Sequence, residues 1–138
     1  MGTQYVLMVH LSPSETLFLT NNECCRLSTC DKNRPHVIPV SYLFYQDYIY
    51  ISTDYNTKKF TNIQKNPHIC LVVDDYLPGN NKGLVLNGVA NIIENGEKYS
   101  EIYELFYKRF RWVREDPWEQ GEAPFLAMHL NTKSSWGL

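Results

Sequence analysis

The stretch from residue 36 to residue 53 constrains the fold more than any other part of the chain. Two runs rich in β-branched and aromatic residues, His36 to Tyr45 and Asp47 to Thr53, are joined by little more than Gln46-Asp47. Two such runs with a minimal connection predict a β-hairpin. Pro39 lies inside the first run. Because proline lacks the N–H that a central strand donates, this strand should be an edge, a bulge or a place where a ligand meets the backbone.

The remaining elements are expected to build an antiparallel sheet around this hairpin. Ser12-Pro13-Ser14-Glu15 is a capping box, which predicts a short helix ending near Asn21-Asn22. The long helix predicted further on carries one apolar stripe, made of Tyr99, Ile102, Tyr103, Phe106 and Phe110. Short connections between sequential strands favour a mainly β fold, a small antiparallel barrel whose open ends are capped by helices. The other expected elements are strands over Cys25–Thr29, His68–Asp74, Gly83–Glu94 and Phe125–Thr132, and helices over Thr57–Gln64 and Glu97–Arg111.

Length and charge narrow the class of protein. The chain has 138 residues, so we expect residues 1–138 to form a single domain. The net charge of −2 argues against a protein that binds bulk nucleic acid. No apolar run approaches the roughly 20 residues that cross a bilayer, so no membrane partner is expected. Aromatic residues make up 14% of the chain, more than a small core needs, and we expect some rings to face a ligand or a second chain.

The four cysteines indicate a reducing compartment. Cys24, Cys25 and Cys30 fall within seven residues, and Cys70 stands alone. This spacing predicts free thiols in a cytoplasmic protein. A metal site built from Cys24, Cys30 and His36 is the alternative. The chain has no Cys-x-x-Cys pair, however, and Cys25 should point to the opposite strand face, so no metal is expected.

The clearest chemical signal lies where a strand meets a helix. The chain has no dinucleotide-binding fingerprint, Walker loop, His-Glu-x-x-His or Gly-x-Ser-x-Gly motif, and no catalytic residue is assigned. A strand ends in Ser52-Thr53, and a helix begins with Thr57-Lys58-Lys59. Helix N-termini present unpaired amides, and hydroxyl and ammonium donors beside them favour a phosphate group. The alternative interpretation is a capped helix with solvated lysines.

A longer stretch around this signal resembles a known family. Residues 26–75, RLSTCDKNRPHVIPVSYLFYQDYIYISTDYNTKKFTNIQKNPHICLVVDD, are similar to the FMN-binding split-barrel family of pyridoxamine 5′-phosphate oxidase and its small relatives. The family pattern is a strand, a turn, "rPhvvPv", a hairpin and an "SrK" helix start followed by "nP". The match extends through Gly88-Val89-Ala90 and covers residues 12–95 well. At the C-terminus the true oxidase carries further substrate-binding residues, so we expect a small related protein.

This resemblance implies a fold, a cofactor and an assembly. The implied fold is an FMN-binding split β-barrel, six-stranded and antiparallel, capped by two or three helices. The implied cofactor is FMN, bound at the two-fold interface of a homodimer.

The resemblance also implies the cofactor-binding residues. Ser52 and Thr53 would contact the flavin, while Thr57, Lys58 and Lys59 would match the Ser-Arg-Lys phosphate clamp. At position 58 lysine replaces arginine, which keeps the charge but loses the bidentate fork. The second subunit would contribute Tyr76 and Lys82, and Trp136 would approach from the tail. The strand that runs along the flavin ring would comprise His36, Val37, Ile38, Pro39, Val40 and Ser41.

These implications favour an FMN-dependent oxidoreductase that acts on an unknown small-molecule substrate. A deazaflavin-dependent reductase on the same barrel is one alternative, although its long acidic coenzyme tail is not favoured by a net charge of −2. A non-catalytic flavin- or haem-binding protein is another, with His129 or His36 as the haem ligand. In the favoured interpretation, Tyr76 and Trp136 account for part of the aromatic surplus because they border the flavin or the second subunit.

Overall fold

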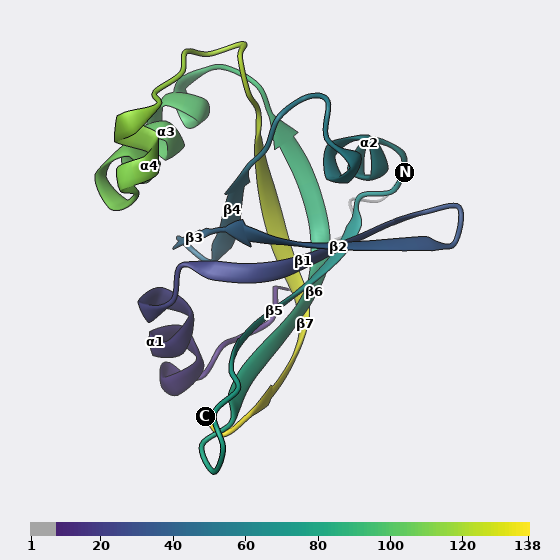
Figure 1. The fold of residues 1–138 in the computed structure, drawn as a ribbon, viewed down its shortest axis with the longest axis vertical. Coiled ribbons are helices and arrows are strands. Elements are labelled where there is room, and N and C mark those ends of the chain that lie inside the picture. Colours follow the sequence, from purple (N-terminus) through teal and green to yellow (C-terminus); the bar gives the residue numbers. More distant parts are fainter. Residues whose placement is uncertain (1–7) are drawn as a thin grey trace.

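The computed structural model describes residues 8–138, whose strands form one curled antiparallel sheet (Figure 1). The strand order is β2-β1-β5-β6-β7-β4-β3, and the described part of the chain also has four helices. The prediction of a mainly β, antiparallel fold with helices is confirmed, with seven strands in place of six and four helices in place of two or three. The strands are β1 (Cys24–Asp31), β2 (Arg34–Ser41), β3 (Leu43–Tyr45), β4 (Tyr48–Ser52), β5 (His68–Asp75), β6 (Lys82–Ile93) and β7 (Phe125–Trp136). The helices are α1 (Pro13–Asn21), α2 (Lys58–Lys65), α3 (Glu97–Arg109) and α4 (Arg111–Glu115).

Tyr42 explains the additional strand. Its backbone N–H donates to the carbonyl of Glu23 at 2.9 Å, and its buried hydroxyl donates to the carbonyl of Leu19 at 2.5 Å. These bonds hold the chain against the end of α1 and interrupt the strand that the sequence predicts over His36–Tyr45. The predicted hairpin is therefore right only for β3 and β4, where Leu43 pairs with Tyr50.

The first half of the predicted strand becomes β2, which pairs with β1 instead. Within that pair Pro39 lies opposite Arg26, and β2 forms one edge of the sheet. The expectation that Pro39 marks an edge strand is confirmed. Two-residue turns close both hairpins, with positive φ at Lys32 and Asn33 in one and at Gln46 and Asp47 in the other. Left-handed backbone at both central positions suits the right-handed twist of paired strands.

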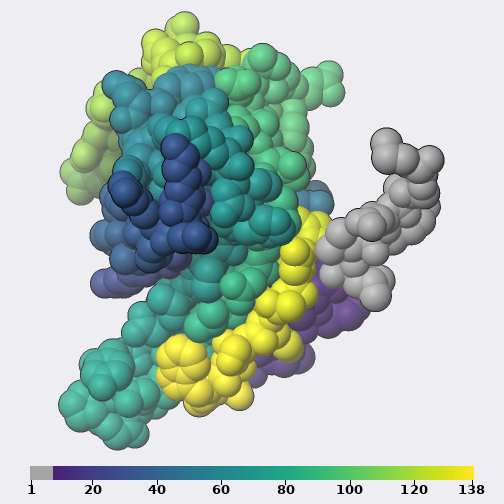
Figure 2. Space-filling view, turned by 90° about the vertical axis from the view of Figure 1, so that its right-hand side faces the viewer, coloured from purple at the N-terminus to yellow at the C-terminus, as the bar shows by residue number. Residues whose placement is uncertain are grey.

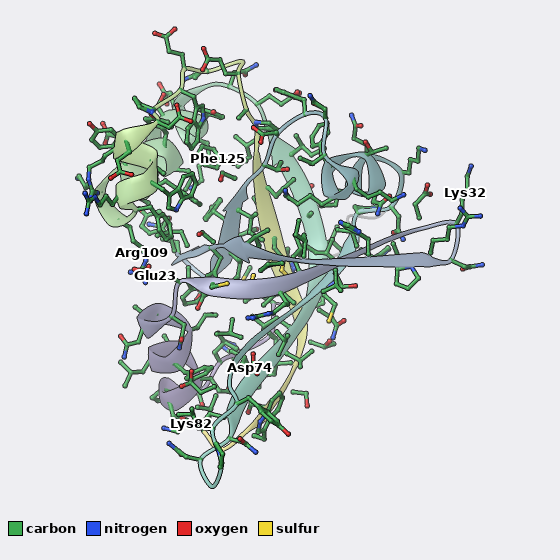
Figure 3. The ribbon with its side chains drawn as sticks, viewed as in Figure 1. Glu23, Lys32, Asp74, Lys82, Arg109 and Phe125 are labelled. Carbon is green, nitrogen blue, oxygen red and sulfur yellow. The ribbon has the colours of Figure 1, made fainter. Side chains whose placement is uncertain are left out.

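Side-chain hydrogen bonds fix both ends of α1, and at its C-terminal end they join it to α3. The capping box of α1 forms as predicted: the Ser12 N–H donates to the Glu15 carboxylate at 2.8 Å, and the Glu15 N–H donates to the Ser12 hydroxyl at 3.2 Å. At the end of α3, Arg109 lies beside Glu23 (Figure 3), and its guanidinium donates to the carbonyls of Thr20 and Asn22 at 2.9 and 3.2 Å. The last turns of α1 and α3 are thereby joined.

The apolar stripe of α3 packs on the sheet as the sequence predicts. Tyr99, Ile102 and Phe106 are buried, and the rings of Tyr99 and Phe106 lie 4.8 and 4.9 Å from the ring of Phe125 in β7. The helix ends at Arg109 rather than at Arg111, because Phe110 takes an extended backbone conformation and separates α3 from α4. A second apolar cluster fills the inside of the curled sheet.

The last strand is longer than predicted. It runs to Trp136 rather than to Thr132, because β6 continues to pair with it as far as Gly83 opposite Trp136.

None of the helices in the described part is long and apolar enough to cross a membrane.

Candidate functional site

A cavity of about 670 Å³ lies between the strand-to-helix junction and α4. One wall is the end of β4 with the start of α2, including Ser52, Thr53 and Lys59. The other wall is α4 and the segment that leads into β7, which carries Trp112 and Trp118. The volume lies within the range of small-molecule and cofactor sites.

Hydroxyl groups organise the first wall. Thr57 is the N-cap of α2, and its hydroxyl accepts from the Phe60 N–H at 3.3 Å. The same hydroxyl donates to the Asp54 carbonyl at 2.9 Å and lies 3.0 Å from the Thr53 hydroxyl. This network fixes the turn between β4 and α2. The two adjacent first-turn amides, of Lys58 and Lys59, precede the first intrahelical bond, so they present the positive end of the helix dipole.

Lys59 is the distinctive charged group of this wall. The residue is only 9% exposed and lines the cavity, yet its side chain forms no hydrogen bond or ion pair with any described residue. Burial lowers the pKa of its ammonium group, and the nearby Asp54 carboxylate partly opposes that effect. The ammonium nitrogen itself is not fully buried, so an anion that enters the cavity could pair with it there.

Lys58 points elsewhere. It lines a second cavity of about 310 Å³ beside the β1–β2 turn, together with Lys32, Arg34, Asp31 and Asn62. The two lysines of the predicted phosphate clamp therefore flank the start of α2 from different sides, each facing its own cavity.

The strand predicted to run along a flavin ring does not line the larger cavity. That strand is β2 at the sheet edge, and the side chain of Val37 is 64% exposed. The lining of the larger cavity includes Ser52, Thr53 and Lys59 but none of His36, Val37, Ile38, Pro39, Val40 and Ser41, although β2 contacts β4.

Tyr76, Lys82 and Trp136 also lie away from that cavity. Lys82 and Phe125 lie at opposite ends of the sheet (Figure 3). Phe125 pairs with Ser52, which lines the larger cavity, so Lys82 is far from that cavity. Trp136 packs its ring over Gly83, and Tyr76 is 84% exposed. The C-terminal residues and the loop between β5 and β6 form the lower tip of the molecule (Figure 2). Within one chain these three residues gather with one another and away from the larger cavity.

The second wall of the larger cavity was missed by the sequence analysis, which treats residues 112–124 as a loop. The rings of Trp112 and Trp118 stack with centroids 6.1 Å apart and planes 13° apart. The Trp118 indole N–H donates to the Tyr99 hydroxyl at 2.7 Å, which fixes this ring against α3. Glu115, Asp116 and Glu122 complete the wall. The available signal was a dense run of tryptophans and acids directly after the apolar stripe.

The cysteines carry no site of their own. All four are free thiols, and the described residues contain no group of His, Cys, Asp or Glu suited to hold a metal ion. Burial raises the pKa of the Cys25 thiol to about 12, so it stays protonated and unreactive at neutral pH. His129, one suggested haem ligand, has its Nδ1 atom 2.8 Å from the Asn131 side-chain oxygen and its ring against Tyr48.

Similar folds occur among solved structures. HutZ, described as the haem storage protein of Vibrio cholerae, superimposes with a TM-score of 0.77 at 16% identity, covering 93% of this chain and 94% of that one. A protein of Mesorhizobium loti described as FAD-binding gives 0.74 at 22% identity, covering 91% and 94%. At these identities the likeness establishes the fold alone.

Sequence comparison identifies the family. A pyridoxamine 5′-phosphate oxidase homolog of Schizosaccharomyces pombe is 27% identical over 100 residues, which cover 65% of this chain. The match spans just 46% of that relative's length. The family model described as pyridoxamine 5′-phosphate oxidase matches residues 15–136, nearly the whole chain. This chain therefore belongs to the pyridoxamine 5′-phosphate oxidase family.

Proposed function

We propose that this protein binds FMN and acts as an FMN-dependent oxidoreductase on a small molecule. The observation that carries the proposal is Lys59, a nine-tenths buried residue at the start of a helix that lines the cavity and has no hydrogen bond or ion pair among the described residues. A phosphate dianion there would pair with this ammonium and with the free amides of α2. The residues present therefore fit the phosphate end of FMN.

The first wall of the cavity would hold the cofactor. Thr53 and Ser52 would orient the flavin next to the phosphate, while Thr57 keeps the turn in place through its bonds to Asp54 and Phe60. Lys58 would contribute long-range attraction from the other side of the helix start. When bound, FMN would supply the transfer of hydride or electrons, and the chain would supply binding, orientation and electrostatics.

The proposal includes a homodimer. The outer edge of β2 pairs with no other strand of the described sheet, and Val37 stands exposed on it. At the lower tip, Tyr76, Leu77 and Trp136 expose apolar surface, which is typical of an interaction site. A two-fold partner that covers these surfaces would bring its Tyr76, Lys82 and Trp136, together with residues 36–41, to the flavin. Within this proposal residues 1–138 act as one flavin-binding domain.

The absorption spectrum of the freshly purified protein tests the cofactor. We expect the visible bands of oxidised flavin in a stoichiometric amount, and mass measurement of the released cofactor should identify FMN rather than FAD or a deazaflavin. A Soret band in place of flavin bands would establish the haem alternative. That alternative is tested because HutZ, described as a haem storage protein, has a similar fold. Reduction of the bound flavin by a nicotinamide donor would separate an oxidoreductase from a flavin store.

A further inference from the structure

The two walls of the larger cavity differ sharply in charge. Among the described residues that line it, Lys59 is the sole cation, and it belongs to the α2 wall. The α4 wall presents Glu115, Asp116 and Glu122, and Asp54 adds a fourth carboxylate from the turn between β4 and α2. Once an anionic group pairs with Lys59, the cavity lining keeps an excess of negative charge, because only Glu115 of these four carboxylates pairs with a cation, Arg111.

Local contacts hold the acidic wall in place. Glu115 accepts from the Arg111 side chain, one helical turn away, at 2.7 Å. The Asp116 N–H donates to the Trp112 carbonyl at 3.2 Å, which ends the helix at this point. Asp54 and Asp116 have no side-chain partner among the described residues, so their carboxylates remain available to a ligand.

The aromatic groups of this wall complement the charges. Trp112 and Trp118 form a nearly parallel stack, and Trp112 is 41% exposed where it borders the cavity. The face of an indole ring attracts cations, and a flat apolar ring also packs on it. Carboxylates beside exposed indole rings are the chemistry that recognises an organic cation.

The buried, unpartnered Lys59 that faces the same cavity is a second and independent sign that this space receives a ligand. Its charge accounts for an anion at the α2 wall. It offers nothing to neutralise the opposite wall.

We propose that the α4 wall binds the substrate, and that this substrate is a ring-bearing organic cation rather than a phosphorylated or carboxylated compound. The proposal rests on the proposed function, because the cofactor phosphate is what pairs with Lys59. A second anion would then meet four carboxylates, of which only Glu115 is paired with a cation, whereas an amine or quaternary ammonium would meet carboxylates and indole faces.

The test uses two ring-matched probes of opposite charge on the flavin-loaded protein. Benzyltrimethylammonium and phenylacetate are titrated by calorimetry, with quenching of tryptophan fluorescence as a second readout. We expect the cation to bind at least about tenfold more tightly than the anion at low salt, and the difference to shrink as ionic strength rises. Equal affinities, tighter binding of the anion or no binding of either probe would overturn the proposal.

Variants locate the effect on the α4 wall. Glu115→Gln combined with Asp116→Asn should reduce affinity for the cation about tenfold. Glu104→Gln combined with Glu119→Gln changes the net charge equally but alters no residue of the cavity, and this control should keep the parent affinity. If the two double variants lose affinity equally, a general charge effect replaces the proposed site.

The same samples separate this proposal from the proposed function. Flavin content is read from the absorption spectrum before each titration. Absence of flavin would overturn the proposed function, while the preference for cation over anion is still measured on the same cavity. Flavin-loaded protein without a charge preference would overturn only the substrate class.

Discussion

The Lys133 ammonium group lies 2.5 Å from the carboxylate of Glu15, which joins the first turn of α1 to the far end of β7. Glu15 is only 4% exposed, and its carboxylate also accepts from the Ser135 hydroxyl at 2.6 Å and from the Ser12 N–H at 2.8 Å. Burial opposes ionisation, but these hydrogen bonds and the Lys133 charge outweigh it and lower the pKa of Glu15 from 4.5 to about 2.

This carboxylate should make stability depend on pH. Because its pKa is lower in the folded protein, the unfolded chain binds more protons between pH 2 and 4.5, and its contribution is lost as pH falls through that window. Above about pH 5 the contribution is complete, on the order of 2 kcal/mol. Urea unfolding at several pH values checks this, with Glu15→Gln expected to remove most of the contribution and flatten the acid limb.

Glu104→Gln is the matched control for that experiment. Glu104 is exposed on α3 and forms no ion pair within the described part of the chain. If both variants show the same dependence on pH as the parent, the pKa of Glu15 is not lowered in the folded protein.

Replacing Lys59 should raise the stability of the cofactor-free protein and lower its affinity for FMN. Lys59→Met replaces a largely buried, partly desolvated lysine with an apolar side chain of similar length, so the cofactor-free protein should gain up to about 1 kcal/mol in free energy of unfolding. FMN affinity should fall at least about tenfold, because the phosphate loses a charge-assisted partner. Thermal unfolding and flavin fluorescence measure the two effects. Lys65→Met, at an exposed lysine 3.6 Å from Asp31, is the control and should change flavin affinity little.

The hydroxyl of Tyr99 should fix the position of Trp118 in the α4 wall of the larger cavity. It donates to the Ala123 carbonyl and accepts from the Trp118 indole N–H, so Tyr99→Phe leaves two groups unsatisfied in a buried site. We expect a loss of about 1–3 kcal/mol in free energy of unfolding and a red shift of tryptophan emission. Tyr107→Phe, at a ring that is 42% exposed, should have neither effect.

Local sequence signals predicted the elements whose stabilising contacts are local. The capping box of Ser12 and Glu15 and the helical stripe from Tyr99 to Phe106 need only neighbours three or four residues apart, and both form as predicted, whereas Phe110 lies just beyond the helix. The break at Tyr42 depends on the carbonyls of Leu19 and Glu23, about 20 residues away, so the local pattern of β-branched residues could not reveal it.

The candidate site was predictable on one wall only. The hydroxyls of Thr53 and Thr57 and the start of α2 follow from adjacent residues, and the structure brings them together. The divergence of Lys58 and Lys59 also follows from helix geometry, because consecutive residues lie about 100° apart around the axis. The acidic wall depends on where α3 and the loop before β7 place α4, which is a matter of tertiary packing.

Two glycines of β6 should respond differently to a new methyl group. At Gly88 a Cβ atom would collide with the backbone carbonyl of His129, where the pairing of β6 with β7 shifts by one residue. At Gly83 it would collide with the far end of the Trp136 side chain, which is 42% exposed and has room to turn away.

Gly88→Ala should therefore cost about 2–4 kcal/mol in free energy of unfolding, since a backbone atom in the middle of a sheet cannot move aside. Gly83→Ala should cost less than about 1 kcal/mol and displace Trp136, which changes tryptophan emission in the folded protein. Urea unfolding and fluorescence of both variants measure the contrast. Equal losses of stability would show that the Trp136 ring is held as firmly as the backbone. In that case the tip formed by Lys82, Gly83 and Trp136 is rigid before any partner covers it.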